Sequence, residues 1–198
     1  MKHLLLTLFL ATSLSSIFAQ SKSPVFGVKA GLNFANLISP DDDEGELSRL
    51  TTFHFGATAE FGIGQNLSLQ PELLFSARGA TTTEDSVEAK VKYNYIVLPV
   101  MLKYYAQPNF SVEFGPSIGF LTSAKVTAAN NTASVGVDVK KLLNSTDFGL
   151  NLGLGYKLNN GINFSTRYYF GLSEVYKKSS DTEKAKHSVF QISVGYTF

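Results

Sequence analysis

The sequence contains no cysteine. It can therefore form neither a disulfide framework nor a thiolate metal site, and it has no cysteine nucleophile. Its 17 basic and 16 acidic residues nearly cancel, which leaves a net charge of +1. A basic surface of the kind that binds nucleic acid is therefore not expected. Beyond the amino-terminal segment, no apolar run approaches the roughly 20 residues that a membrane-spanning helix needs.

Glycine and aromatic residues are abundant instead. The 198 residues include 16 Gly, 16 Phe and 9 Tyr. Aromatic residues favour β-strands over helices. A chain of this length fits one domain, so composition alone already points to a single β domain.

The amino-terminal segment has the layout of a secretory signal peptide. A basic start at Lys2 precedes an apolar run over residues 4–18, and Ala19 offers a small residue for cleavage. The run is too short and too rich in serine to favour the alternative, an uncleaved membrane anchor. We therefore expect residues 1–19 to be a signal peptide and residues 20–198 to be the mature domain.

Eight segments of the mature chain alternate between large apolar residues and small or polar ones. In the last of them, Phe190, Ile192 and Val194 alternate with Gln191 and Ser193. Strict alternation of this kind is typical of a β-strand with two different faces. The eight segments cover about residues 25–37, 53–63, 67–78, 93–105, 110–120, 148–158, 162–172 and 190–198. The sequence therefore predicts eight strands.

The composition of the two faces indicates which one points outward. In a soluble sandwich or a lipocalin-like barrel, the bulky face points inward and charged residues cover the outside. Here the second face is rich in Gly and Ser, which solubilise an exterior poorly but suit a narrow interior, and the apolar face is almost free of charge. Apolar residues facing lipid, in segments of about 10 residues, are typical of transmembrane barrels.

The lengths of the connections support the same interpretation. Short turns with Asn, Gly or Pro fall at residues 64–66, 107–109 and 159–161, whereas residues 38–50, 80–92, 127–146 and 176–187 form long polar connections. Short and long connections alternate, as do the periplasmic turns and outer loops of membrane barrels. Because lipid offers no partner to a backbone amide, the strands must also close on themselves. We predict an all-β fold, an eight-stranded antiparallel up-and-down transmembrane β-barrel, with both termini periplasmic.

The inward face of the predicted barrel carries charges of both signs. These residues are Lys29, Glu60, Glu72, Arg78, Lys103, Glu113, Lys157 and Arg167. An eight-stranded barrel is just wide enough for side chains to fill it, and unpaired charges inside it would be costly. We therefore predict a network of ion pairs that plugs the lumen. A charge-lined conduction path is the alternative, but eight strands are few for one.

The histidines do not indicate an enzyme. His54 is predicted to face inward, where it would be a hydrogen-bonded lumen residue. His187 and Ser188 form an adjacent His/Ser pair, but neighbours on a strand point to opposite faces, so they cannot act directly as base and nucleophile. No catalytic residue is predicted.

Two further features of the sequence could indicate a ligand site, but a structural interpretation fits each of them better. The carboxylates between residues 41 and 46 are of the type that binds Ca²⁺, but their spacing matches no defined loop, and a solvated acidic loop fits better. Gly149, Gly153 and Gly155 precede no helix that could complete a nucleotide motif, so we expect them to be close-packing positions inside the barrel. No cofactor or metal site is predicted.

Four segments and the last residue carry a resemblance to a known family. They are Phe26-Gly27-Val28-Lys29-Ala30-Gly31-Leu32-Asn33, Leu69-Gln70-Pro71-Glu72-Leu73-Leu74-Phe75-Ser76, Leu98-Pro99-Val100-Met101-Leu102-Lys103-Tyr104, Phe114-Gly115-Pro116 and the terminal Phe198. In this order and spacing they resemble the small outer-membrane β-barrel domains of Bacteroidetes called PorT-like. The resemblance implies an outer-membrane location and insertion by the barrel-assembly machinery, which recognises a last strand that ends in an aromatic residue such as Phe198. The namesake of the family belongs to a protein-secretion and gliding apparatus.

Three hypotheses of function follow. The first is a monomeric structural or interaction module with a non-conducting lumen, whose four outer loops contact outer-membrane lipids, lipopolysaccharide or surface partners. The second is a component of a secretion, gliding or transport assembly built on the same barrel. The third is a lipid-modifying enzyme, which would need a nucleophile and a base on one face near a barrel rim.

Overall fold

The computed structural model describes residues 23–38, 48–84, 87–129, 134–176 and 185–198. The predicted signal peptide and the acidic run at residues 41–46 lie outside these ranges. Within them the chain forms nine strands and one short 3-10 helix, Lys140–Leu142. No helix of the described residues is long and apolar enough to cross a membrane.

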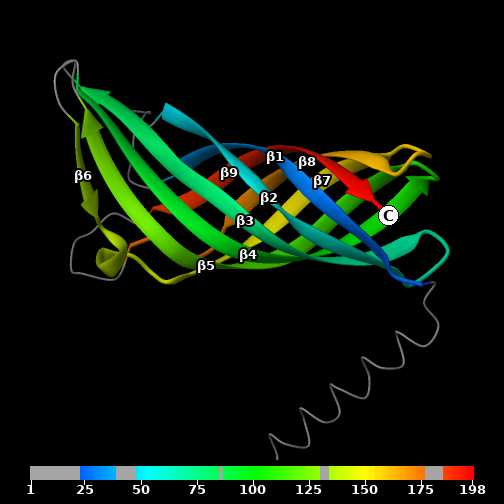
Figure 1. Ribbon diagram of the computed structural model, residues 1–198. Helices are drawn as coiled ribbons and strands as arrows, with labels where there is room; N and C mark the ends of the chain where they lie inside the picture. The colour runs from blue at the N-terminus through cyan, green and yellow to red at the C-terminus, as the bar shows by residue number, and fades with distance from the viewer. Residues whose placement is uncertain (1–22, 39–47, 85–86, 130–133, 177–184) are drawn as a thin grey trace, which may run out of the picture.

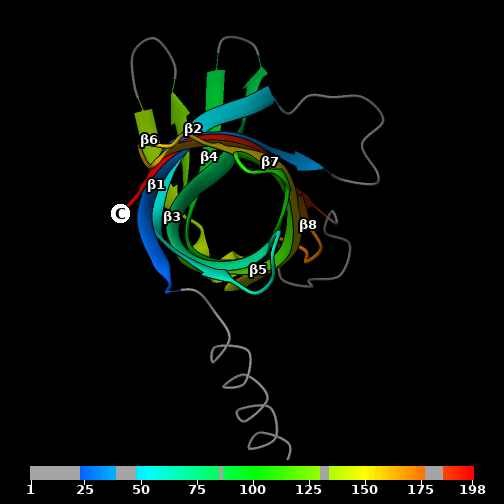
Figure 2. The same ribbon diagram turned by 90° about the vertical axis from the view of Figure 1, so that its right-hand side faces the viewer.

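Eight of the nine strands close into a barrel. The strands are β1 (Val25–Ile38), β2 (Ser48–Gly62), β3 (Leu67–Glu84), β4 (Val87–Gln107), β5 (Phe110–Ala129), β6 (Ser134–Asp138), β7 (Thr146–Lys157), β8 (Ile162–Gly171) and β9 (Lys186–Thr197). Antiparallel pairing runs around the ring β1-β2-β3-β4-β5-β7-β8-β9, and β9 pairs back with β1. Figure 1 shows the tilted strands from the side, and Figure 2 shows the ring along its axis. The predicted fold class is confirmed.

The barrel buries its charges and exposes its apolar residues. Arg167 and Glu72 are only 3% and 4% exposed, whereas Phe55 and Leu152 are 51% and 50% exposed. A soluble protein distributes these residue types in the opposite way. The exposed apolar side chains form a belt around the outside, including Phe26, Val28, Leu32, Phe53, Leu73, Phe114, Phe148, Phe164 and Ile192. This is the surface that a barrel presents to the hydrocarbon of a membrane.

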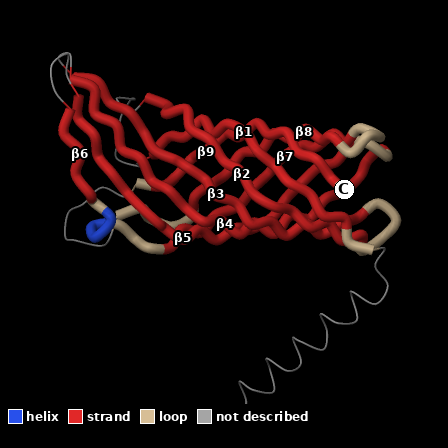
Figure 3. The backbone as a smooth tube through the Cα atoms, in the orientation of Figure 1, coloured by secondary structure: helices blue, strands red, loops and turns tan. Residues whose placement is uncertain are grey.

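The two ends of the barrel differ. At one end, which we call the turn end, lie the three short turns, the start of β1 and the carboxyl terminus (Figures 1 and 3). There the Phe198 amide donates to the carbonyl oxygen of Phe26 at 2.9 Å. At the other end, which we call the loop end, β3, β4 and β5 extend beyond the ring, and β6 pairs with the far part of β5.

This extension corrects two predicted loops. Most of residues 80–92 belongs to β3 and β4, which stay paired from Gly79–Lys92 out to Glu84–Val87. Part of residues 127–146 likewise forms the end of β5, β6 and the 3-10 helix. Outside the lipid, neither face of a strand needs to be apolar, so these polar strands carry no alternating pattern. They were indistinguishable from loops in the sequence for that reason.

Candidate functional site

Six of the eight predicted lumen charges form one connected series of ion pairs. From the turn end inward, the order is Glu60, Lys103, Glu113, Arg167, Glu72 and Lys29. They come from β2, β4, β5, β8, β3 and β1, where strand alternation turns each of these side chains toward the axis. Three cations and three carboxylates make the series neutral. All six residues are buried.

Arg167 is the centre of the series. Its Nη1 and Nη2 each donate a 2.8 Å hydrogen bond to the carboxylate of Glu72, and its Nε donates at 2.8 Å to Oε2 of Glu113. Bidentate arginine–carboxylate pairs are among the stronger hydrogen-bonded contacts in proteins. β8 and β3 are four strands apart in either direction around the ring. The pair between Arg167 and Glu72 therefore crosses the full width of the lumen.

The side of the network nearer the turn end is more open. Lys103 Nζ lies 3.4 Å from Oε2 of Glu60 and 3.5 Å from Oε1 of Glu113. Tyr105 donates its hydroxyl to Glu60 at 2.5 Å. Lys157 lies apart from the series and is half-buried at the rim of the barrel. There, together with Glu60 and Tyr105, it lines an open cavity of about 920 Å³. The lumen is thus accessible from the turn end down to the first ion pairs.

On the loop-end side of Arg167, uncharged polar groups fill the next layer of the lumen. His54 hydrogen-bonds Oδ1 of Asn33 at 2.7 Å and Oγ of Ser193 at 2.8 Å, and Gln191 donates to the same Asn33 oxygen at 2.7 Å. Asn33 in turn donates to the carbonyl oxygen of Ala77 at 2.6 Å. His54 is therefore a buried, hydrogen-bonded lumen residue with partners on two other strands, β1 and β9.

A second ion pair lies toward the loop end. Arg78 Nη1 donates at 2.5 Å to Asp147, which also accepts a hydrogen bond from the Tyr169 hydroxyl at 2.5 Å. The guanidinium carbon lies 4.2 Å from the centre of the Tyr169 ring, so the cation also stacks on an aromatic face. In the same layer, Tyr95 and His187 join across the barrel, with 3.1 Å between Oη and Nε2. Since β4 and β9 are also four strands apart, this contact spans the lumen as well.

The sequence analysis missed Asp147. The residue precedes the first large apolar residue of its segment, Phe148, so the predicted strand began one position too late. Asp147 has the same parity as the inward-facing Gly149 and Asn151, and β7 begins at Thr146. Extending the alternation by one residue identifies the partner of Arg78.

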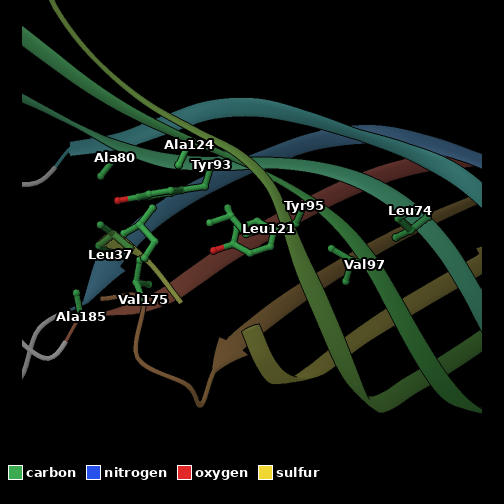
Figure 4. Close-up of a cluster of buried hydrophobic side chains, with 11 residues drawn as sticks. Leu37, Leu74, Ala80, Tyr93, Tyr95, Val97, Leu121, Ala124, Val175 and Ala185 are labelled. Carbon is green, nitrogen blue, oxygen red and sulfur yellow. The ribbon is translucent and has the colours of Figure 1, made fainter. Parts of the chain in front are cut away.

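An apolar cluster closes the loop end of the lumen. Figure 4 shows Tyr93, Leu121 and Val175 gathered with their neighbours beside Tyr95. The full cluster is Leu37, Leu74, Ala80, Tyr93, Tyr95, Val97, Leu121, Ala124, Leu143, Val175 and Ala185, all buried. We call it the apolar cap. Asn144 fastens the segments that supply Leu143 and Val175, because its Nδ2 donates to the carbonyl oxygens of Glu174 and Tyr176 at 2.8 and 3.0 Å.

The closed β-barrel with an apolar exterior agrees with the comparisons. Residues 18–177 match the family described as outer membrane protein beta-barrel domain. The chain belongs to this family. It is accordingly an integral β-barrel protein of the bacterial outer membrane.

Solved structures of small outer-membrane barrels share this fold. Neisserial surface protein A superposes with a TM-score of 0.53 at 11% identity, over 89% of this chain and 100% of that one. Ail, the attachment invasion locus protein of Yersinia pestis, gives a TM-score of 0.52 at 11% identity with the same coverage. At this identity the likeness shows the fold alone. No curated protein sequence matches the chain.

The glycines of β7 make room for the network of this outer-membrane barrel. A Cβ atom on Gly153 would lie 2.6 Å from Cγ of Arg167, and one on Gly149 would lie 2.4 Å from the Tyr169 ring. A Cβ on Gly155 would lie 2.6 Å from Oε1 of Glu113. These positions therefore need glycine because the long inner side chains pass directly over them.

The adjacent His187 and Ser188 are not arranged as a catalytic pair. His187 is buried inside the barrel, whereas Ser188 hydrogen-bonds the hydroxyl of Tyr168 on the other side of the strand. In the part of the chain that the structure describes, no group of three or more His, Asp or Glu residues is placed to hold a metal ion. In this arrangement the lumen side chains occupy the interior, neutralise one another's charges and link strands on opposite sides of the barrel.

Proposed function

We propose that this outer-membrane barrel is a non-conducting membrane anchor that presents its loop-end extension to other components of the cell envelope. The observation that carries the proposal is the Arg167–Glu72 pair, which crosses the lumen. An ion moving along the axis would have to displace this neutral, hydrogen-bonded pair and then the Tyr95–His187 contact. It would also meet the apolar cap, where only the tyrosine hydroxyls of Tyr93 and Tyr95 interrupt a hydrocarbon lining that solvates an ion poorly.

The orientation belongs to the proposal. Short turns face the periplasm in known membrane barrels, and longer connections face outward. The turn end, with both termini, would then be periplasmic, and the four longer connections would lie outside. Phe198 is 76% exposed at this end, where the barrel-assembly machinery would recognise it as the PorT-like resemblance implies. We propose that the barrel functions as a monomer.

The loop-end extension is the part suited to contacts. β3, β4 and β5 continue beyond the ring as a hairpin sheet, and β6 adds a further strand. Val137 and Leu142 are 56% and 67% exposed in this region, outside the lipid-facing belt. We propose that a partner contacts the extension at these two side chains.

The loop-end extension also supports the second candidate function, a fixed component of a secretion, gliding or transport assembly. The resemblance of Phe26–Asn33 and Leu98–Tyr104 to PorT-like barrels points in the same direction. A photo-crosslinking residue in place of Val137 would capture a defined envelope partner if this function holds. The same residue at the lipid-facing Phe55 is the matched control. We propose no enzymatic activity, since His187 and Ser188 face opposite sides of their strand.

The anchor proposal is tested by solute efflux from vesicles. The purified barrel, refolded into vesicles loaded with a small sugar, should release the sugar no faster than vesicles without protein. A general porin reconstituted at equal density is the positive control. Rapid release that scales with the amount of folded barrel would refute a non-conducting lumen.

A further inference from the structure

The outward face of β4 and β5 changes character as the strands leave the lipid belt. From the belt toward the loop end, the successive cross-strand pairs are Ile96–Phe120, Asn94–Ser123 and Lys92–Lys125. In the middle pair the asparagine amide donates to the serine hydroxyl at 2.8 Å. The face therefore passes from apolar to neutral polar to cationic in two steps. The inward neighbours Tyr93 and Ala124 are buried in the apolar cap, so the two lysines point outward.

The geometry of the strands gives the height of the lysine pair. Four residues separate Ile96 from Lys92, which corresponds to about 13 Å along a strand at roughly 3.4 Å per residue. With a tilt of about 40°, this is about 10 Å along the membrane normal. Lipid headgroups occupy several ångströms beyond the hydrocarbon, and lysine side chains bend toward them. The ammonium groups of Lys92 and Lys125 are thus within reach of the headgroup layer.

The lysine pair places two positive charges directly opposite one another. Like charges directly opposite one another on a sheet are destabilising. Neither ammonium group forms an ion pair with any residue that the structure describes. A third ammonium group lies close by, since Lys140 Nζ donates at 2.9 Å to the carbonyl oxygen of Thr122, a neutral acceptor.

Among the residues that the structure describes, one carboxylate adjoins this group. Asp138 is the β6 neighbour of Lys125, and its Oδ1 accepts the backbone N–H of Lys140 at 2.9 Å. Three ammonium groups against one carboxylate leave a local charge of +2. We call Lys92, Lys125 and Lys140 the lysine cluster.

We propose that the lysine cluster binds the phosphate groups of anionic lipids in the leaflet at the loop end. This inference deepens the proposed function. It rests on that function only for the orientation of the barrel, which makes the leaflet at the loop end the outer one. Lysine is a common ligand for phosphate, and each lysine near an anionic membrane surface contributes about 1 kcal/mol, or roughly fivefold in affinity. Removing Lys92 and Lys125 together should therefore weaken binding by about 25-fold.

The test uses the refolded chain in phosphatidylcholine vesicles, into which phosphatidylglycerol is titrated. Samples are incubated at a series of temperatures, and the folded fraction at each temperature is read from gel mobility without further boiling. We expect anionic lipid to raise the unfolding temperature of the wild-type barrel in a saturable manner. In the Lys92→Gln/Lys125→Gln variant, the affinity for phosphatidylglycerol fitted from this titration should fall about 25-fold, and in each single variant about fivefold. The variants should unfold like the wild type in neutral vesicles.

Lys186→Gln is the matched control. Lys186 is also an exposed loop-end lysine, but its cross-strand neighbour on β1 is Ile38 rather than a second cation. This variant should titrate within about twofold of the wild type. Equal titration of the double variant and the wild type, or no effect of phosphatidylglycerol on the wild type, would overturn the proposal. So would stabilisation by inorganic phosphate in neutral vesicles, which would assign the cluster to free phosphate. The sugar-efflux assay tests the non-conducting lumen separately, so either proposal can fail without the other.

Discussion

Replacing Arg167 with methionine tests whether the lumen network holds the barrel together. The substitution replaces the unbranched apolar stem of arginine and removes its guanidinium, with three hydrogen bonds to carboxylates, two to Glu72 and one to Glu113. At about 1.5–3 kcal/mol each, these bonds set an upper limit on the loss. Lys29 and Lys103 remain beside the two carboxylates and compensate them in part. Breaking a buried pair from one side costs about 3–5 kcal/mol, and we expect a loss of unfolding free energy in this range.

A second variant separates lost packing from uncompensated charge. The variant Arg167→Met/Glu72→Gln removes one cation and one anion, so the series stays neutral overall, although Lys29 loses its ion pair with Glu72. We expect it to unfold within about 2 kcal/mol of the wild type, less destabilised than the single variant.

The measurement is equilibrium unfolding in denaturant, with the barrel in lipid vesicles. The chain contains no tryptophan, so the folded fraction is best read from the mobility of unheated samples on a gel. An Arg167→Met variant within about 0.5 kcal/mol of the wild type, the usual range for a surface substitution, would refute the reasoning. So would a double variant that loses the sum of the two single losses.

Three further predictions use the same unfolding assay or a fractionation assay. Gly153→Ala should cost about 1–3 kcal/mol because the new Cβ meets the Thr166 carbonyl oxygen and the Arg167 side chain, whereas Gly62→Ala, with no atom within 4 Å of the added Cβ, should cost far less. Lys103→Gln should cost about 2–3 kcal/mol since it leaves Glu60 and Glu113 short of a partner, and Lys157→Gln at the rim should stay within about 0.5 kcal/mol. Deleting Phe198 should reduce the amount of barrel in the outer-membrane fraction of cells while the same chain still refolds into vesicles; unchanged recovery from cells would contradict an assembly role.

The lipid-embedded part of the fold could be predicted from the sequence because the membrane imposes a strict rule on it. Each spanning strand must place apolar residues outside and small or polar residues inside, so alternation marks the strands, as in Phe148 to Leu158. The contrast is weakest in β4, where Tyr93, Tyr95 and Met101 fill the lumen and the inner face is itself partly apolar. Beyond the lipid the rule no longer applies, and the extension of β3, β4 and β5 escaped prediction.

The sequence predicted which side chains of the candidate site point into the lumen, but not which of them form ion pairs with one another. Inward parity placed Lys29, Glu72 and Arg167 in the lumen, and the width of eight strands required them to meet. Which cation meets which carboxylate depends on the stagger of strands that are distant in sequence, such as β3 and β8. Alternation along one strand contains no information about that stagger. The apolar cap had no separate signal, because Leu143 lies in the predicted connection 127–146 and Val175 lies between the predicted strand 162–172 and the predicted connection 176–187.

The central claim is that side chains close the lumen from wall to wall, and single-channel recording in planar bilayers tests it most directly. With the wild-type barrel inserted and shown to be folded by its gel mobility, the account predicts no resolvable current steps at moderate voltage. Insertion should change neither the conductance nor the noise of the bilayer beyond its baseline. Reproducible ohmic steps from folded, monomeric barrels, persisting at both polarities, would contradict it.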